Sequence, residues 1–387
     1  MRTILKWRMR AALMALLAAV VVGLWKREEL QRLWAVNTLF DEGRIVGNFS
    51  NMERAFLTVP VPRGDGPVSA LPQGAAMVLP EGAAQWIEAR AVTSLVVLHE
   101  GRIVHESYHL GTGAEDKRIS WSMAKSFLSA LFGILEAEGA IASMDAPVTD
   151  YAPQLAGSAY DGVSIRNVLQ MTSGVAFDED YLDYDSDINR MGRVLALGGT
   201  MDGFAAGLQA RAAQPGGMWD YVSIDTHVLG MVVRGSTGRD IPALMAEKVI
   251  APLGPEAAPY YLTDGEGVAF VLGGLNMRSR DYARFGLMYE QMGALGGAQV
   301  VPRDWVRDAT RASAPTAPGE MGYGYQWWIP AGAPEGVFMA RGIYGQYIYI
   351  DQARDAVVVV TAADRRFRDS GVDAANVAMM RRIAEAL

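Results

Sequence analysis

Cysteine is absent from the 387-residue chain, and histidine occurs only four times. Without thiols the protein has no disulfide bond, no thiolate metal site and no cysteine nucleophile. Acidic residues outnumber basic ones, 43 against 35, which leaves a net charge of −8. That charge balance argues against a nucleic-acid partner. The rest of the composition, 50% hydrophobic and 20% charged, is that of a globular protein with one large α/β domain or two lobes.

Two patterns that imitate metal sites do not meet the requirements for binding a metal ion. His105 and His109 form an H-x-x-x-H pattern on an expected strand, which would place them about 13 Å apart. The alternating aspartates of residues 183–187 resemble the start of a calcium loop, but the glycine and the final glutamate of such loops are missing. We therefore expect neither a metal ion nor an organic cofactor.

The one long apolar segment follows a basic N-terminus. Residues 1–10 carry four basic side chains, and residues 11–25 carry no charge. A spanning helix needs about 20 apolar residues, so Trp7 and Met9 are expected to extend the span as interfacial anchors. The lack of a small-residue cleavage site favours an uncleaved anchor over a signal peptide, and the basic flank disfavours a buried helix. We expect the basic flank to stay on the cytoplasmic side of a membrane and the bulk of the chain to lie on the far side.

Residues 26–84 predict an N-terminal extension and linker, with Pro/Gly punctuation at 59–74, and residues 85–387 predict the functional domain. Within the domain, apolar periodicity and turn residues define the elements. The expected elements are a hairpin at 94–111 that turns at Glu100-Gly101, a helical lobe at 145–265, a helix at 272–293, strands at 322–330, 345–351 and 356–364, and an amphipathic helix at 375–387.

The segment ISWSMAKSFLSALFG, residues 119–133, places Ser122 and Lys125 on one face of an expected helix. A serine hydroxyl needs a nearby base to act as a nucleophile at neutral pH. The apolar residues around Lys125 are expected to bury it and lower its pKa, which suits such a base. The N–H groups at the helix start can serve an oxyanion. No G-x-S-x-G elbow is present, and the alternative is a solvated lysine in a chance S-x-x-K pattern.

Two further segments contain residues suited to the same chemistry. In PGGMWDYVSIDTHVLG, residues 215–230, Tyr221 and Ser223 approach an expected helix, and a tyrosine near a lysine can relay a proton to a leaving group. In ARGIYGQYIYID, residues 340–351, two glycines permit close approach of a ligand to the backbone. The alternatives are a core tyrosine and a β-bulge.

Taken in order, these motifs resemble those of the penicillin-recognising serine enzymes. Within them the chain is similar to the class C β-lactamase-related group, which includes the 6-aminohexanoate-dimer hydrolases (nylon-oligomer hydrolases) and related esterases. The resemblance covers roughly residues 85–387 and is carried by SMAKSF, LQMTSGVAFDEDY, PGGMWDYVS, APLGP, GGLNMRSRDYARFG, YGYQWW and GIYGQYIYID. It implies the serine β-lactamase/transpeptidase-like α/β fold, a mostly antiparallel sheet flanked by helices with an inserted helical lobe. The site would lie between the lobe and the sheet.

The resemblance also implies roles for individual residues. Ser122 would be acylated, Lys125 would be the general base, and Tyr221 would pass a proton to the leaving group. The backbone N–H groups of Ser122 and Ile343 would form the oxyanion hole. The residues expected to contact the substrate are Tyr181 (or its neighbour Tyr184), Ser223, Trp327, Trp328, Gly342 and Tyr344.

Two motifs depart from the family pattern. Where these enzymes usually carry Lys-Thr-Gly or His-Thr-Gly, this chain has Ala340-Arg341-Gly342, and Ser223 replaces the usual asparagine. Strand alternation is expected to turn Arg341 to the face opposite Ala340. We therefore expect hydrolysis of a carboxylic ester or small linear amide. The alternatives are a β-lactamase or D-Ala-D-Ala peptidase, and a membrane-tethered sensor or binding domain without turnover.

An acidic loop follows the helix and S-x-x-K motif. Its six carboxylates belong to Asp178, Glu179, Asp180, Asp183, Asp185 and Asp187. One interpretation is a solvated loop. The other is a mouth that attracts an amine-bearing substrate such as an amino-acid oligomer or amide.

Overall fold

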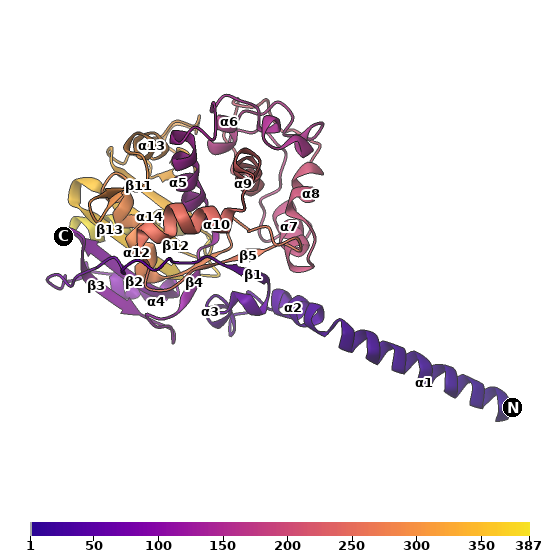
Figure 1. The fold of residues 1–387 in the computed structure, drawn as a ribbon. Helices are drawn as coiled ribbons and strands as arrows, with labels where there is room; N and C mark the ends of the chain where they lie inside the picture. The colour runs from indigo at the N-terminus through magenta and orange to yellow at the C-terminus, as the bar shows by residue number, and fades with distance from the viewer. Residues whose placement is uncertain (1) are drawn as a thin grey trace.

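Antiparallel sheets form the centre of the protein, which Figure 1 shows as a computed structural model describing residues 2–387. The main sheet contains, in spatial order, β3 (Arg102–Tyr108), β2 (Val92–His99), β13 (Ala356–Ala362), β12 (Gln346–Asp351), β11 (Val337–Gly342), β10 (Trp328–Ile329) and β9 (Gly322–Tyr323). A second sheet contains β1 (Leu57–Pro60), β5 (Tyr260–Thr263), β6 (Leu275–Arg278) and β4 (Lys117–Ile119), and a third pairs β7 (Ala294–Leu295) with β8 (Ala298–Gln299).

Helices cover the main sheet and form a lobe beside it, with α6 to α9 on the right of the body in Figure 1. The helices are α1 (Arg2–Trp25), α2 (Arg27–Asn37), α3 (Ile45–Asn48), α4 (Ala83–Ala89), α5 (Ala124–Ala137), α6 (Ile165–Leu169), α7 (Asp187–Ala196), α8 (Met201–Ala206), α9 (Ser223–Thr237), α10 (Ile241–Met245), α11 (Ala251–Leu253), α12 (Ser279–Glu290), α13 (Arg303–Ala309) and α14 (Val372–Glu385). A 3₁₀ turn, η2 (Trp121–Met123), leads directly into α5.

Side-chain alternation in the main sheet separates two hydrophobic cores. Val357 and Val359 of β13 belong to the core that contains the apolar side chains of α5 and α12. Val358 and Val360 belong to the other core, which contains those of α4 and α14. Because both faces of the sheet are covered, the strand is an unbroken apolar run rather than an alternating one.

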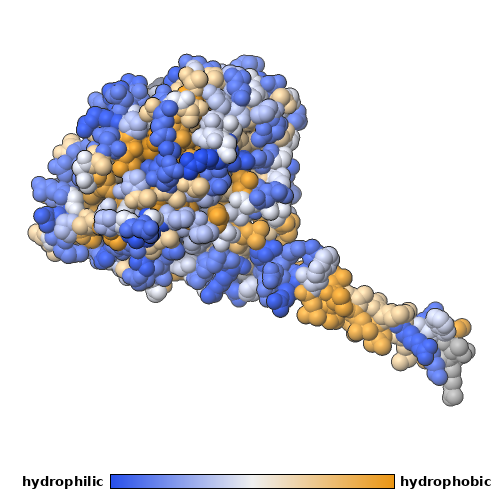
Figure 2. All heavy atoms as spheres, in the orientation of Figure 1, coloured by the Kyte–Doolittle hydropathy of each residue, from blue (hydrophilic) through white to orange (hydrophobic). Residues whose placement is uncertain are grey.

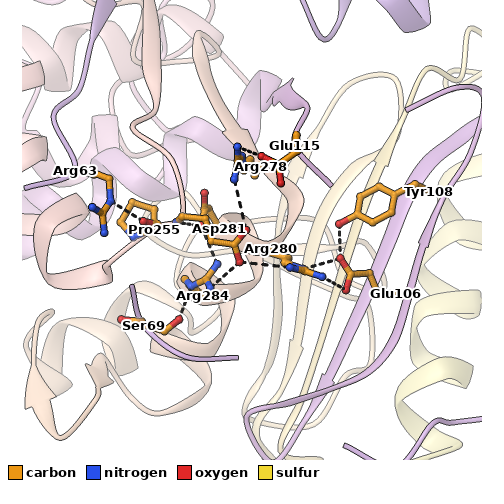
Figure 3. Close-up of polar contacts among 11 residues, drawn as sticks. Arg63, Ser69, Glu106, Tyr108, Glu115, Pro255, Arg278, Arg280, Asp281 and Arg284 are labelled. Atoms are coloured by element: carbon orange, nitrogen blue, oxygen red, sulfur yellow. Dashed lines mark hydrogen bonds and ion pairs between the residues drawn. The ribbon is translucent and has the colours of Figure 1, made fainter. Parts of the chain in front are cut away.

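Ion pairs fasten β3 to the start of α12, as Figure 3 shows. Arg280 donates to both carboxylate oxygens of Glu106, at 2.7 and 2.8 Å. One turn later, Arg284 donates to Asp281 at 2.8 Å and to Glu256 at 2.9 Å. Charged groups at buried positions are tolerated when they are paired in this way. This network is part of the scaffold, since none of its members lines the cavities that contain Ser122.

The N-terminal helix α1 projects away from the body, and its middle carries apolar surface (Figures 1 and 2). Residues Ile4–Trp25 are long and apolar enough to cross a membrane, with a mean hydropathy of 1.7 and none of the tested window buried in the fold. A signal sequence has the same properties. The helix is longer than the apolar run at 11–25, since the basic flank is helical too.

The structure confirms some of the predicted elements and corrects others. The hairpin is confirmed, and its turn residues Glu100 and Gly101 both have positive φ, 49° and 71°, as a two-residue turn requires. The helix predicted over 272–293 is partly wrong, because Leu275–Arg278 form β6 and α12 begins only at Ser279. Pairing of β6 with β4 and β5 overrides the helical periodicity there. The predicted linker at 59–74 also begins within a strand, β1.

Candidate active site

Two cavities meet at Ser122, which lines both of them together with Tyr181 and Ile343. The larger cavity has a volume of about 800 Å³ and many charged side chains in its walls. The smaller cavity has a volume of about 350 Å³ and mainly apolar walls. The larger cavity is also lined by Glu179, Tyr221, Trp328, Arg341, Gly342 and Arg368. The smaller one is also lined by Phe40, Leu182, Met191, Leu195, Phe270 and Leu272.

Ser122 lies in η2, between α5 and strand β4 of the second, four-stranded sheet. The preceding residue, Trp121, has a φ of 43°, a left-handed conformation that is rare for a bulky side chain and costs about 1–3 kcal/mol. The N–H of Ser120 donates to the carbonyl of Leu275 in β6 at 2.8 Å, which fixes the turn to the sheet. This strained turn exposes the Ser122 side chain to both cavities.

Lys125 lies one helical turn after Ser122 and is almost completely buried. Its Nζ is 3.4 Å from the carbonyl oxygen of Ser223 and 5.4 Å from the ring centroid of Tyr221. Burial lowers the pKa of Lys125 to about 7, although the carboxyl groups of Glu179 and Asp225 act in the opposite direction. A lysine with this pKa is partly neutral at physiological pH and can accept a proton.

Tyr221 lines the larger cavity but not the smaller one. Burial raises the pKa of Tyr221 above its ordinary value, the Glu179 carboxylate raises it further, and a hydrogen bond with Ser122 opposes the rise. Its ring is 5.2 Å from that of Trp328. The phenol therefore stays protonated at neutral pH and is suited to donating a proton beside Ser122.

The end of β11 contacts the backbone of η2. A Cβ atom added to Gly342 would lie 2.5 Å from the carbonyl oxygen of Ser120 and 3.1 Å from the nitrogen of Ser122. Only glycine permits this approach, and Ile343 follows directly. In the described residues, the N–H groups of Ser122 and Ile343 donate to no loop or turn carbonyl. Two free N–H donors beside a nucleophile are the usual components of an oxyanion hole.

Glu179 is a site residue that sequence reasoning did not single out. Its Oε1 accepts a hydrogen bond from Tyr181 at 2.6 Å, and its Oε2 accepts one from the N–H of Ser223 at 3.1 Å. The hydroxyl of Ser223 also donates to it. Burial raises the pKa of Glu179, while the positive charge of Lys125 opposes that rise. The only sequence signal was its membership of the acidic loop, which does not distinguish it from five other carboxylates.

Asp225 is a second carboxyl group near Lys125 that the sequence did not reveal. It is fully buried, and Tyr160 donates to its Oδ1 at 2.7 Å. Burial raises the pKa of Asp225 to about 8, so this group is mostly protonated at neutral pH. Glu179 differs from Asp225 in accepting hydrogen bonds from Tyr181 and from both the N–H and the hydroxyl of Ser223, which favour its charged form.

The aromatic residues expected to wall the site separate into two groups. Trp328 lines the larger cavity, whereas Trp327 is fully buried and packs 4.4 Å from the Tyr289 ring, so it does not reach the substrate space. Tyr344 lines neither cavity, because its ring stacks on Phe40 at 4.9 Å within an aromatic cluster. The expected substrate contacts of Trp327 and Tyr344 therefore do not hold. Adjacent residues point in opposite directions, and the sequence did not say which way.

Tyr181 lines both cavities, and its neighbour Tyr184 lines only the smaller one. Ser223 also lines the smaller cavity. In the acidic loop, Asp178 and Asp180 line the larger cavity beside Glu179. Asp187 instead accepts from the N–H of Asp178 at 2.9 Å, which stabilises the loop. Some carboxylates of the acidic loop thus line the larger cavity, and Asp187 instead stabilises the loop itself.

Arg341 lies on the face of β11 opposite Ala340, as alternation predicts, but it still lines the larger cavity. It pairs with Asp373 of α14 and lies 5.2 Å from the Trp328 ring. Its position on the face opposite Ala340 therefore does not exclude it from the wall of the larger cavity. Arg341 lies on the face of β11 that packs on α14, and at this end of the strand that face also borders the larger cavity.

The described residues contain no group of three or more His, Asp or Glu side chains placed to hold a metal ion. His105 and His109 each contact the hydroxyl of Ser107 through Nε2, at 3.0 Å. The expected separation of about 13 Å applies to extended backbone positions, and the rings lean toward the serine between them. Each ring thus has a hydroxyl partner.

The fold has an antiparallel sheet covered by helices on both faces and an inserted helical lobe, and the S-x-x-K serine lies between them. This combination defines a serine hydrolase of the β-lactamase/transpeptidase type. The chain belongs to the Beta-lactamase family, whose profile matches residues 83–379. The family and the fold class inferred from the motifs are therefore confirmed.

Similar proteins are named as hydrolases. The chain is 30% identical over 289 residues to 6-aminohexanoate-dimer hydrolase of Paenarthrobacter ureafaciens, a match that covers 71% of this chain and 73% of the relative. A Bacillus anthracis structure assigned to the 6-aminohexanoate-dimer hydrolases has a TM-score of 0.79 at 22% identity and covers 90% of this chain and 95% of its own. A family VIII carboxylesterase has a TM-score of 0.59 at 17% identity and covers 81% and 99%. The chain is an enzyme of this hydrolase family.

Proposed function

We propose that the protein hydrolyses a carboxylic ester or a small linear amide through an acyl-serine intermediate on Ser122. The observation that carries the proposal is the buried Lys125, one turn after the serine, with its pKa lowered to about 7. A base is most effective when its pKa lies near the working pH. Ser122 lies where two cavities meet, so a substrate can extend on both sides of the scissile bond.

The proposed reaction assigns one residue or pair of N–H groups to each step. The neutral Nζ of Lys125 takes the proton of Ser122 as its Oγ attacks the carbonyl carbon. The N–H groups of Ser122 and Ile343 hold the oxyanion. Tyr221 donates its proton to the leaving oxygen or nitrogen as that bond breaks, and the proton on Lys125 replaces it. A water molecule then attacks the acyl-serine, gives its proton to the same base system, and the proton returns to the Ser122 Oγ as the ester bond breaks.

The larger cavity suits a leaving group that carries an amine. Six of its lining residues are acidic, and two are arginines. The acidic ones are Asp178, Glu179, Asp180, Asp220, Asp369 and Asp373. This excess of negative charge raises the local concentration of a cationic substrate.

β-Lactam turnover is the weaker candidate. A penicillin carboxylate needs a free cation beside the β11 strand, but Ala340 supplies none. The charge of Arg341 is already paired with Asp373. The proposal therefore treats the chain as an esterase or amidase with an altered carboxylate site.

We further propose that the domain of residues 85–387 lies outside the cytoplasm of a bacterial cell. Residues 1–10 would remain cytoplasmic, α1 would anchor the chain in the inner membrane, and residues 26–84 would connect the anchor to the domain. If the segment of residues 1–25 is cleaved, the same domain is a free periplasmic enzyme.

The test is the intact mass of the full chain in detergent after incubation with a fluorophosphonate, beside Ser122→Ala. We expect one covalent adduct on the parent and none on the variant. Steady release of p-nitrophenol from p-nitrophenyl butyrate should accompany it, with nitrocefin turned over far more slowly. No adduct on the parent would overturn the proposal. An adduct without turnover would support the sensor alternative instead.

A further inference from the structure

The smaller cavity is an apolar space with the nucleophile at one end. Its walls include Phe40, Met191, Leu195 and Phe270, and Ser122 opens into it. Of these wall residues, Met191 and Leu195 belong to α7 in the helical lobe. A space of about 350 Å³ with mainly apolar walls suits an apolar group of a substrate.

The N-terminal extension forms one wall of this cavity. Val36, Leu39 and Phe40 line it, and they lie at the end of α2 and just beyond. Leu39 is buried, and the Phe40 ring is stacked on Tyr344, so this wall is firmly packed against the domain. The segment between the apolar helix α1 and the domain is therefore part of the binding site as well as a connector.

The position of Tyr221 indicates which part of the substrate enters each cavity. Tyr221 donates to the leaving group in the proposed reaction, and it lines only the larger cavity. The leaving group must then lie in the larger cavity. The acyl group, which stays bonded to Ser122, extends to the other side, where the walls are apolar.

We infer that the smaller cavity is an acyl-chain site that takes a linear aliphatic acyl group, with the N-terminal extension as one of its walls. This inference rests on the proposed acyl-serine reaction and names its substrate class. The substrate is an ester or amide with an apolar acyl chain and a polar leaving group. Each methylene buried in such a site is expected to raise kcat/KM about fourfold.

Gly192 of α7 offers a position from which a larger side chain can narrow the cavity. It lines the cavity, and a Cβ atom added there would meet no other atom within 4 Å. Gly47 of α3 is a matched control, because it is also helical with open space around a Cβ, and it lines neither cavity. The variants are Gly192→Phe and Gly47→Phe in the full chain, reconstituted in phospholipid vesicles.

The experiment measures kcat/KM for p-nitrophenyl acetate, butyrate, hexanoate and octanoate. We expect the parent and Gly47→Phe to show the rise with chain length. In Gly192→Phe the ratio of kcat/KM for the octanoate ester to kcat/KM for the acetate ester should fall at least tenfold. Far-ultraviolet circular dichroism and the melting temperature establish that both variants are folded.

Two results overturn the inference while leaving the proposed function intact. One is a parent that hydrolyses acetate through Ser122 without any preference for chain length. The other is a Gly192→Phe variant, shown to be folded, that keeps the parent's ratio. Absence of hydrolysis for every ester, together with absence of a Ser122 adduct, refutes the proposed function and the inference with it.

Discussion

The ammonium nitrogen of Lys125 lies 3.4 Å from the main-chain carbonyl oxygen of Ser223. Ser223 in turn donates through its N–H and its hydroxyl to the carboxylate of Glu179. One residue at the start of α9 thus connects the proposed base in α5 with a carboxylate in the acidic loop. This relationship makes the protonation of Lys125 depend on Glu179 as well as on burial.

The pH dependence of the enzyme should report the ionisation of Lys125. Burial lowers the pKa of Lys125 to about 7, and only its neutral form accepts a proton from Ser122. We therefore expect kcat/KM for a neutral ester to rise with pH through a midpoint near 7. Because the pKa of Tyr221 is raised above its ordinary value, the activity should then stay level in mildly alkaline solution.

A control for this prediction is Lys125→Arg. Arginine stays charged at every accessible pH, so kcat should fall by about 10²–10⁴-fold. A profile from about pH 5 to about pH 9 without an inflection near 7 would contradict the assignment of Lys125 as the base.

Glu179→Gln should move the same midpoint to lower pH. The Glu179 carboxylate raises the pKa of Lys125, so removal of its charge lowers that pKa further, by about one unit. The glutamine oxygen can still accept from Ser223, which keeps the local structure. The measurement is the pH profile of kcat/KM, and Glu179→Asp, which keeps the charge, should have a midpoint close to that of the parent. A residue with a purely structural role would change the rate or the stability but leave the midpoint in place.

Gly342→Ala should impair the proposed oxyanion hole. The added methyl group would lie 2.5 Å from the Ser120 carbonyl oxygen, so β11 must move away from η2. Displacement of one oxyanion donor is expected to lower kcat by about 10²–10³-fold. Gly113→Ala is the control, since a Cβ atom there meets nothing within 4 Å. Equal kcat values for the two variants would mean that the end of β11 takes no part in the reaction.

Neutralisation of the larger cavity should affect cationic substrates selectively. The double variant Asp178→Asn/Asp180→Asn removes two carboxylates from its wall, and Asn can keep their loop contacts. We expect KM for an amine-bearing amide to rise roughly 3- to 10-fold, while KM for a neutral ester is unchanged. The rise in KM for the amide should be smaller at higher salt concentration, because salt screens the charges. Asp185→Asn is the control, because Asp185 is exposed and lines neither cavity. Equal effects on both substrates would contradict a role for these charges in recognition.

The sequence by itself determined the features that depend on neighbouring residues. Ser122 and Lys125 lie one turn apart in any helix, so their proximity follows from spacing alone. The hairpin at Glu100-Gly101 follows from turn residues between two β-rich runs. The apolar run at 11–25 and the valines of β13 likewise required no tertiary information. The ordered motifs were enough to identify the family and the fold class.

Only the tertiary structure decided which residues share an environment when they are distant in the chain. It put Trp328 in the wall of the larger cavity and buried Trp327 in the core. It also paired Leu275–Arg278 as strand β6, although the sequence pattern there predicts a helix. It also separated Glu179 from its acidic neighbours and brought Phe40 of the extension to the wall of a cavity at Ser122. The physical reason is that burial, pKa and cavity shape arise from packing between elements, and local spacing carries no record of which elements will pack together.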